Sequence, residues 1–154
     1  MSGLTLSSLR MSKPLLVRQS PVHGTGLFAT RQISEGERLI EYQGKRIEWK
    51  AMEDTGSGHT FLMGLSDGRV IDGGIRGSRA RYLNHSCDPN CEIYETDGRV
   101  FVYSRRAVGA GEELTLDYQL QVDGRITASV RRRYACRCES PKCRKTMLWL
   151  PEAA

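Results

Sequence analysis

Three cysteines near the end of the chain restrict its folding more than any other feature of the sequence. Cys136, Cys138 and Cys143 form the pattern C-x-C-x4-C, which places three thiols within eight residues. A tetrahedral zinc site takes four soft ligands, and this cluster supplies three of them. The fourth thiol has to come from Cys87 or Cys91, the other two cysteines. The pattern therefore predicts a metal that fastens the C-terminal tail to a segment about fifty residues earlier.

Free thiols or disulfides are the alternative for these cysteines. A disulfide between Cys136 and Cys138 would be strained, because residues two positions apart suit disulfide geometry poorly. The odd count of five cysteines also speaks against a disulfide framework in an intracellular protein. Zinc is the favoured interpretation, and such a site would contribute on the order of 10 kcal/mol to ordering the tail.

Length and composition indicate a single globular domain. The chain has 154 residues, of which 39% are apolar and 27% charged, an ordinary balance for a soluble protein. No apolar run approaches the roughly 20 residues that a membrane helix needs, so no membrane partner is expected. Residues 1–13 look like a flexible leader and lack the features of a signal peptide. We expect an intracellular protein, cytoplasmic if bacterial and nuclear or chromatin-bound if eukaryotic or delivered to a host.

The basic charge has two interpretations. The net charge is +5, and the arginines gather in clusters. Such clusters suit a surface that approaches nucleic acid or a nucleoprotein, but they also suit a solvated face. No single run is long enough to decide between them. The clusters are Arg76/Arg79/Arg81, Arg105-Arg106 and Arg131-Arg132-Arg133.

Short strands dominate the expected secondary structure. Two hairpins are indicated, one turning at Ser66-Asp67-Gly68 and one at Asp97-Gly98, a strong turn signal. The alternating segments predict a mainly β domain whose elements are too irregular to name a fold from periodicity. The expected strands cover 14–20, 38–47, 59–65, 69–72, 92–107 (as a hairpin) and 112–118, with a short helix at 48–55 and a helical turn at 76–83.

A polar loop is expected in the segment RYLNHSCDPNC, residues 81–91. Asn84 and His85 carry directional hydrogen-bonding groups beside Tyr82, and turn-forming residues follow them. Taken alone, the segment is best interpreted as a capped turn whose histidine is a satisfied core residue. The neighbouring candidate ligand Cys87 favours a functional site instead.

Two further segments carry weaker signals. The string HGTGL, residues 23–27, has two glycines that let the backbone approach a ligand closely, although it is also compatible with a simple turn. It matches neither the dinucleotide fingerprint nor a P-loop. The string GEELTLDY, residues 111–118, predicts a strand with Leu114 and Leu116 on one face. Tyr118 is compatible with an ordinary strand-end aromatic.

Taken together and in order, these segments resemble the SET-domain protein lysine methyltransferases. The resemblance spans residues 14–150 and implies a SET-domain fold of several small sheets with a knot-like C-terminal threading and a post-SET zinc site. It divides the chain into a leader (1–13), a SET domain (14–134) and a post-SET segment (135–150). The matching strings are HGTGLFA (23–29), EYQG (41–44), RVID (69–72), ARYLNHSCDPNC (80–91), GEELTLDY (111–118) and CRCESPKCRKTML (136–148).

The resemblance also implies two cofactors, S-adenosyl-L-methionine and Zn²⁺, and a role for each matching residue. Tyr118 corresponds to the catalytic tyrosine, assisted by Tyr82, and Phe61 and Leu116 line the substrate channel. Trp149 in the tail would cover the adenine, unless it simply packs on the core. The implied cofactor-binding residues are His23, Gly24, Thr25, Gly26, Tyr42, Asn84, His85 and Trp149, and the implied zinc ligands are Cys87, Cys136, Cys138 and Cys143.

The implied reaction is methyl transfer to the ε-amine of a lysine in a protein, with a basic, histone-like tail as the expected substrate and a nucleosome or nucleic acid nearby. Leu116 and Phe61 stand where the family often has hydroxyl-bearing or larger aromatic residues. The extra room predicts di- or trimethylation. Lys145 replaces a glycine found in many members, and we expect little effect. The competing functions are a non-catalytic module that binds lysine-containing peptides and a small basic zinc protein that binds nucleic acid.

Overall fold

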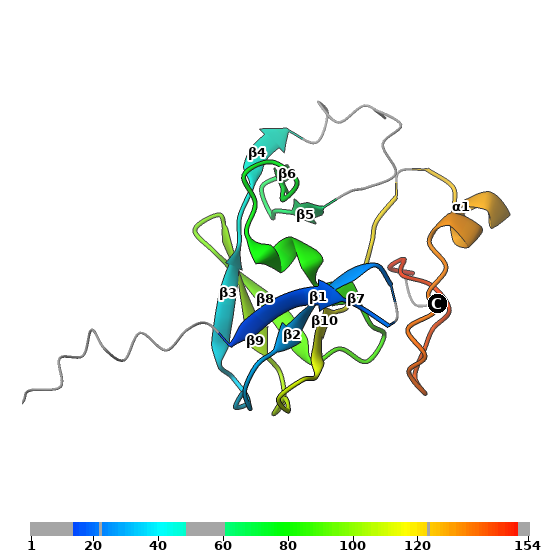
Figure 1. Ribbon diagram of the computed structural model, residues 1–154. Coiled ribbons are helices and arrows are strands. Elements are labelled where there is room, and N and C mark those ends of the chain that lie inside the picture. The colour runs from blue at the N-terminus through cyan, green and yellow to red at the C-terminus, as the bar shows by residue number, and fades with distance from the viewer. Residues whose placement is uncertain (1–13, 22, 49–60, 123, 151–154) are drawn as a thin grey trace, which may run out of the picture.

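A computed structural model of the protein describes residues 14–21, 23–48, 61–122 and 124–150. In these residues the chain forms short strands in three small sheets and very little helix (Figure 1). None of the helices in this part of the chain has the length and apolar character needed to cross a bilayer. The prediction of a mainly β architecture with several small sheets is confirmed.

The first sheet brings the polar segments of the sequence together. Its strand order is β1-β2-β10-β7. Strands β1 and β2 form an antiparallel pair, and β10 lies between β2 and the two-residue strand β7. The β10–β7 pairing is parallel, with Thr115 opposite Asn84 and Leu116 opposite His85. The bounds are β1 Leu15–Gln19, β2 Thr25–Ala29, β7 Asn84–His85 and β10 Glu113–Leu116.

The second sheet has the order β3-β9-β8 and contains the predicted hairpin at Asp97-Gly98. Both turn residues have positive φ, 50° and 72°, as the favoured two-residue hairpin turn requires. The third sheet, β4-β6-β5, contains the other predicted hairpin. The bounds are β3 Arg38–Tyr42, β8 Cys91–Thr96, β9 Arg99–Ser104, β4 Lys45–Glu48, β5 Leu62–Gly64 and β6 Arg69–Asp72.

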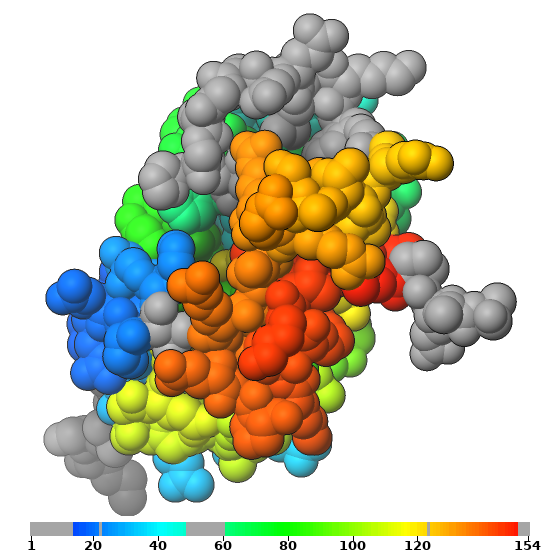
Figure 2. All heavy atoms as spheres, turned by 90° about the vertical axis from the view of Figure 1, so that its right-hand side faces the viewer, coloured from blue at the N-terminus to red at the C-terminus, as the bar shows by residue number. Residues whose placement is uncertain are grey.

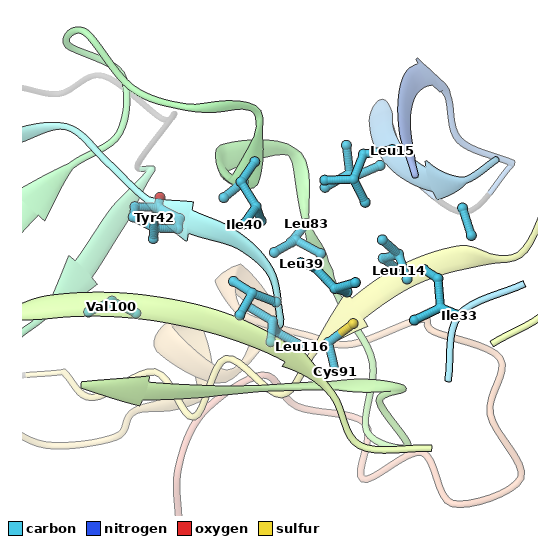
Figure 3. Packing of buried hydrophobic residues seen from close by; sticks show 14 of the residues in the cluster. Leu15, Ile33, Leu39, Ile40, Tyr42, Leu83, Cys91, Val100, Leu114 and Leu116 are labelled. Carbon is cyan, nitrogen blue, oxygen red and sulfur yellow. The ribbon is translucent and has the colours of Figure 1, made fainter. Parts of the chain in front are cut away.

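The core lies between the sheets and is built from the inward faces of their strands (Figure 3). Leu114 and Leu116 are both buried, as their alternation in β10 predicts. The turn η3 (Arg79–Tyr82) covers part of the core through Ala80 and confirms the helical turn expected at 76–83. Among the described residues, those with no exposed surface are Leu27, Ile33, Ala80, Val102, Val108 and Leu114.

The secondary structure differs from the expected one in two places. Residues 38–47 form two strands in different sheets, because the chain turns at Gly44, where a Cβ would lie 2.1 Å from the Asp72 carbonyl oxygen. Helix α1 (Ala128–Arg133) was not expected; Thr127 caps it by accepting a hydrogen bond from the Val130 N–H. Most of the helix expected at 48–55 lies outside the described residues.

Candidate functional site

The side chain of Asn84 joins the three segments that the first sheet brings together. Its Nδ2 lies 3.0 Å from the His23 carbonyl oxygen and 3.1 Å from that of Thr25. The same nitrogen lies 2.8 Å from Oε1 of Glu113, at the start of β10. The amide is thus held by the turn before β2 on one side and by a carboxylate on the other.

The two glycines of the string HGTG serve this arrangement for different reasons. Gly24 has a φ of +49°, in the left-handed region that glycine adopts without strain, and nothing lies within 4 Å of the place its Cβ would take. A Cβ on Gly26 would lie 2.3 Å from Glu113 Oε1. Gly26 therefore leaves room for the carboxylate that holds Asn84, and Ser20 Oγ donates a hydrogen bond to Oε2 of the same group at 2.9 Å.

Tyr118 lies directly against the polar loop. Its backbone N–H donates to His85 Nδ1 at 3.0 Å, and its ring meets the His85 ring edge-on with centroids 5.3 Å apart. Its hydroxyl donates to the Leu83 carbonyl oxygen. Although 39% of the residue is exposed, burial and then the charge of Glu113 raise the pKa of Tyr118 to about 12. The phenol therefore stays protonated at neutral pH and cannot serve there as a base.

His85 connects Tyr118 to the cysteine cluster. Because its Nδ1 accepts a hydrogen bond from Tyr118, the proton of the neutral ring lies on Nε2, 3.3 Å from Cys87 Sγ. Burial lowers the pKa of His85, which favours this neutral form, while Asp117 opposes the shift. The ring is thus a satisfied buried side chain, and it bridges two parts of the site.

Of the two predicted channel residues, Phe61 lies in an aromatic pair with Tyr82, whereas Leu116 belongs to the core. Phe61 and Tyr82 pack edge-on, with ring centroids 6.2 Å apart, and the Arg81 guanidinium lies 4.7 Å from the centre of the Tyr82 ring. Tyr42, which we expected among the cofactor residues, is buried and donates its hydroxyl to the Phe61 carbonyl oxygen at 2.7 Å. Leu116 lies in the core, opposite His85.

The four predicted ligands come together in one cluster. The Sγ atoms of Cys87, Cys136, Cys138 and Cys143 all lie within 4.8 Å of one another. A zinc tetrahedron with bonds of about 2.3 Å separates its sulfur atoms by about 3.8 Å, and the Cys87–Cys136 separation is 3.7 Å. Cys91 lies instead in the hydrophobic core, 1% exposed (Figure 3). Of the two candidates that the sequence left open for the fourth position, the geometry favours Cys87.

The chemistry of the cluster suits a divalent cation. Burial raises the pKa of the Cys136 thiol. Burial acts the same way on Cys138, but hydrogen bonds from the backbone amides of Cys87 and Ser140 lower its pKa to about 6. Four thiolates this close together repel one another unless a cation neutralises them. The residues present therefore fit Zn²⁺.

The tail that carries the cluster packs beside Tyr118. Arg144 contacts Asp117 with both terminal nitrogens, at 2.9 and 2.8 Å, and its backbone N–H points to Cys87 Sγ at 3.3 Å. Leu120 exchanges backbone hydrogen bonds with Met147 and Trp149. Figure 2 shows the tail (orange to red) lying across one face of the molecule.

Two tail residues singled out in the sequence lie at the surface. Trp149 is 49% exposed, so it does not pack into the core; with Leu148 and Asp117 it lines a pocket of about 150 Å³. Lys145 has a φ of +65°, in the left-handed region where a side chain costs about 1 kcal/mol or more. A glycine at this position would avoid this strain.

Sequence reasoning missed Glu113, Ser20 and the Asp117–Arg144 pair. Glu113 lies inside the string GEELTLDY, but nothing local shows which residue it contacts. Asn84 is 29 positions away, and only the pairing of β10 with both β2 and β7 brings the two together. Arg144 directly follows the candidate ligand Cys143, which is the one local signal that it would lie near the cluster.

Comparison with known proteins establishes the family. The SET domain family model matches residues 24–119. Histone-lysine N-methyltransferase set1 of Dictyostelium discoideum is 33% identical over 94% of this chain. A Saccharomyces cerevisiae histone-lysine N-methyltransferase described as H3 lysine-4 specific is 34% identical over 92% of it, and trr of Drosophila melanogaster is 34% identical over 84%. The chain belongs to the SET domain family.

These relatives are far longer than this chain. It covers 10% of the Dictyostelium protein, 14% of the yeast protein and 6% of the Drosophila protein. The similarity therefore concerns one domain of each relative.

Proposed function

We propose that this protein transfers methyl groups from S-adenosyl-L-methionine to the ε-amine of a lysine in a histone-like protein. The observation that carries the proposal is the meeting of Asn84, the turn at His23–Gly26 and Tyr118 around one sheet, with the cysteine-held tail beside them. Membership of the SET domain family and relatives named as histone-lysine N-methyltransferases support it.

Residues around Asn84 fit the cofactor's amino-acid end. The exposed turn at residues 23–25 has open space at Gly24, and the Glu113 carboxylate lies next to it. An ammonium group calls for acceptors of this kind. His23, Gly24, Thr25, Gly26, Asn84 and His85 would hold S-adenosyl-L-methionine from this side, with Trp149 covering it from the tail. Tyr42 lies nearer the channel residues, and its cofactor role is the least supported.

The bound cofactor would supply an electrophilic methyl group on a sulfonium. The chain's own residues have to deliver a neutral amine to it in line. A lysine with a pKa near 10.4 is mostly protonated at neutral pH, and a channel walled by Phe61 and Tyr82 would lower that pKa by excluding water. Tyr118 acts by orientation, because its phenol remains protonated and is fixed on the Leu83 carbonyl.

The decisive experiment combines cofactor binding with turnover. Calorimetry with S-adenosylhomocysteine should show binding by the wild-type protein and much weaker binding by Asn84→Ala. Tyr118→Phe should bind the cofactor normally, yet lose about 100-fold or more in methyl transfer to histone H3, because misorientation of reacting groups has effects of this size.

Each competing function predicts a different result. Cofactor binding without turnover on any histone would indicate a non-catalytic peptide-binding module. No cofactor binding at all would leave the small zinc protein that binds nucleic acid. If Tyr118→Phe kept wild-type turnover, the assignment of Tyr118 would be wrong.

The apolar residues Phe61 and Leu116 predict more than one methyl group per lysine. Mass spectrometry of a histone peptide at long reaction times should show di- or trimethyl lysine, and Phe61→Tyr should shift the product toward monomethyl. The substitution adds only a hydroxyl that can hold a water near the amine. Monomethyl product alone from the wild-type protein would contradict the prediction.

On this proposal the protein works where DNA-bound, histone-like proteins lie. That place is the cytoplasm if the chain is bacterial, and the nucleus or chromatin if it is eukaryotic or delivered to a host.

A further inference from the structure

Basic charge is concentrated in the last described segment, residues 124–150. It carries eight cationic side chains and one carboxylate, Glu139, for a net charge of +7. The whole chain carries +5, so all other residues together carry −2. A zinc ion with four thiolates adds −2 and reduces this excess without cancelling it. The cationic residues are Arg125, Arg131, Arg132, Arg133, Arg137, Lys142, Arg144 and Lys145; we call them the basic face.

These side chains are exposed, and all but one lack a carboxylate partner within the part of the chain that the structure describes. All eight residues are exposed, and among the described residues only Arg144 forms an ion pair, with Asp117. In the rest of the described chain, four of the eleven arginines form an ion pair. Arg31, Arg69, Arg99 and Arg106 each pair with a nearby carboxylate.

The basic face covers helix α1 and the tail that carries the cysteine cluster, on the side of the molecule shown in Figure 2. Three of its arginines follow one another in α1, which has no buried residue. Successive helical residues point about 100° apart, so these three arginines extend from the helix in different directions. The face adjoins the candidate site, because Arg144 contacts the residue before Tyr118.

This surface does not suit the proposed substrate tail itself. A lysine-rich peptide would be repelled by a net charge of +7. Unpaired, exposed arginines and lysines suit a phosphate backbone. Single-stranded nucleic acid calls for exposed rings between the basic residues. Here Tyr134 is the one aromatic between the basic residues, and it is only partly exposed with the Arg133 guanidinium over its ring. The exposed Trp149 follows the last basic residue and lines the pocket beside Asp117.

We infer that the basic face binds the phosphate backbone of duplex DNA, so that the enzyme docks on the DNA of a nucleoprotein while the lysine enters the site nearby. This inference rests on the proposed function for its choice of substrate, but the DNA contact stands on the charge distribution. The contacts are independent of base sequence, because only backbone phosphates are engaged.

The test measures binding of the zinc-loaded protein to a labelled 20-base-pair duplex by fluorescence anisotropy between 50 and 200 mM NaCl. The variant Arg131→Gln/Arg132→Gln/Arg133→Gln removes three charges from the basic face. The matched control Lys45→Gln/Arg76→Gln/Arg105→Gln removes three exposed charges elsewhere. At 100 mM NaCl we expect the helix variant to bind at least about tenfold more weakly, with a salt slope smaller by about 3, since each lost phosphate contact removes about one. The control should bind like the wild type.

Equal weakening by both variants would overturn the inference, as would tighter binding to single-stranded RNA or to polyglutamate than to the duplex. Methylation of a free histone peptide by the same preparations separates the two proposals. Peptide methylation without duplex binding would refute only the inference that the basic face binds DNA. Duplex binding without any methyl transfer would refute only the proposed function.

Discussion

At the scale of single residues, the site depends on a carboxylate that the sequence motif does not mark as functional. Glu113 accepts hydrogen bonds from Asn84 and from Ser20, and Gly26 leaves the space in which it lies. Its neighbour Glu112 is equally half-buried but pairs with Arg106 and with the Gly109 N–H. The two adjacent glutamates therefore form a natural comparison.

Glu113→Ala should weaken binding of S-adenosylhomocysteine by about tenfold or more, because a hydrogen bond to a charged group contributes about 1.5–3 kcal/mol and its loss frees the Asn84 side chain. Glu112→Ala removes a similar set of charged hydrogen bonds without touching Asn84. Calorimetry on both variants is the measurement. Equal losses of affinity would mean that Glu113 supports the fold and does not position Asn84.

Gly26→Ala should act through the same carboxylate. The new methyl group would displace the flexible end of Glu113, so we expect the affinity to fall about as far as in Glu113→Ala. The double variant should then be little worse than either single one, since coupled residues are not additive. Additive losses in the double-mutant cycle would show that Gly26 acts independently.

At the scale of elements, the sequence predicted the structures that depend on neighbouring residues and missed those that depend on distant ones. Asp97-Gly98 and Ser66-Asp67-Gly68 both form hairpin turns, as predicted. Such turns are predictable because their conformation depends on residues that are adjacent in the sequence. Strand β7 could not be predicted, since two residues carry no periodicity and its pairing with β10 is a long-range contact. The break at Gly44 was missed for a related reason: the atom that forces it belongs to Asp72, far along the chain. The clustering of three thiols was predictable, whereas the choice of Cys87 over Cys91 needed the resemblance or the fold.

The segment between β6 and η3 depends on another close approach. A Cβ on Gly77 would lie 1.8 Å from the carbonyl oxygen of Gly73, and backbone cannot move aside as a side chain can. Gly77→Ala should therefore lower the free energy of unfolding by about 2 kcal/mol or more, with loss of activity, because Gly73 packs against Tyr42 and Phe61.

Gly64→Ala is the matched control for this prediction. Gly64 lies in β5 with no positive φ and with nothing within 4 Å of its Cβ position. Its replacement should change the stability by no more than about 0.5 kcal/mol. Urea unfolding compares the two, and similar stabilities would show that the segment can relax around Gly77.

At the scale of the whole molecule, two separate bridges connect the cysteine cluster to Tyr118. One runs from Cys87 through the His85 ring to the Tyr118 backbone. The other runs from Arg144 to Asp117, the residue before Tyr118. The tail also continues the backbone pairing at Leu120. Metal binding and active-site geometry should therefore depend on one another.

Removal of zinc with a chelator should loosen both the tail and the segment that carries Tyr118. We expect faster amide hydrogen exchange at residues 117–120 and 143–149, and weaker binding of S-adenosylhomocysteine, with little change in the sheet β3-β9-β8. Without the cation, the four thiols are no longer linked to one another and the tail is no longer held. In such sites the free energy of metal binding contributes directly to the free energy of folding.

Cysteine variants decide whether this effect comes from the cluster. Cys143→Ala should lose zinc, as measured by elemental analysis, and should show the same exchange pattern as the chelated protein. Cys91→Ala also removes a buried thiol, but from the core, and it should keep one zinc per chain and normal exchange at 117–120. If Cys91→Ala lost the metal, the ligand set would be wrong. The other contrary outcome is loss of the zinc by Cys143→Ala while amide exchange at residues 117–120 stays slow. The two bridges would then not couple metal binding to the position of Tyr118, and the tail would only stabilise the fold.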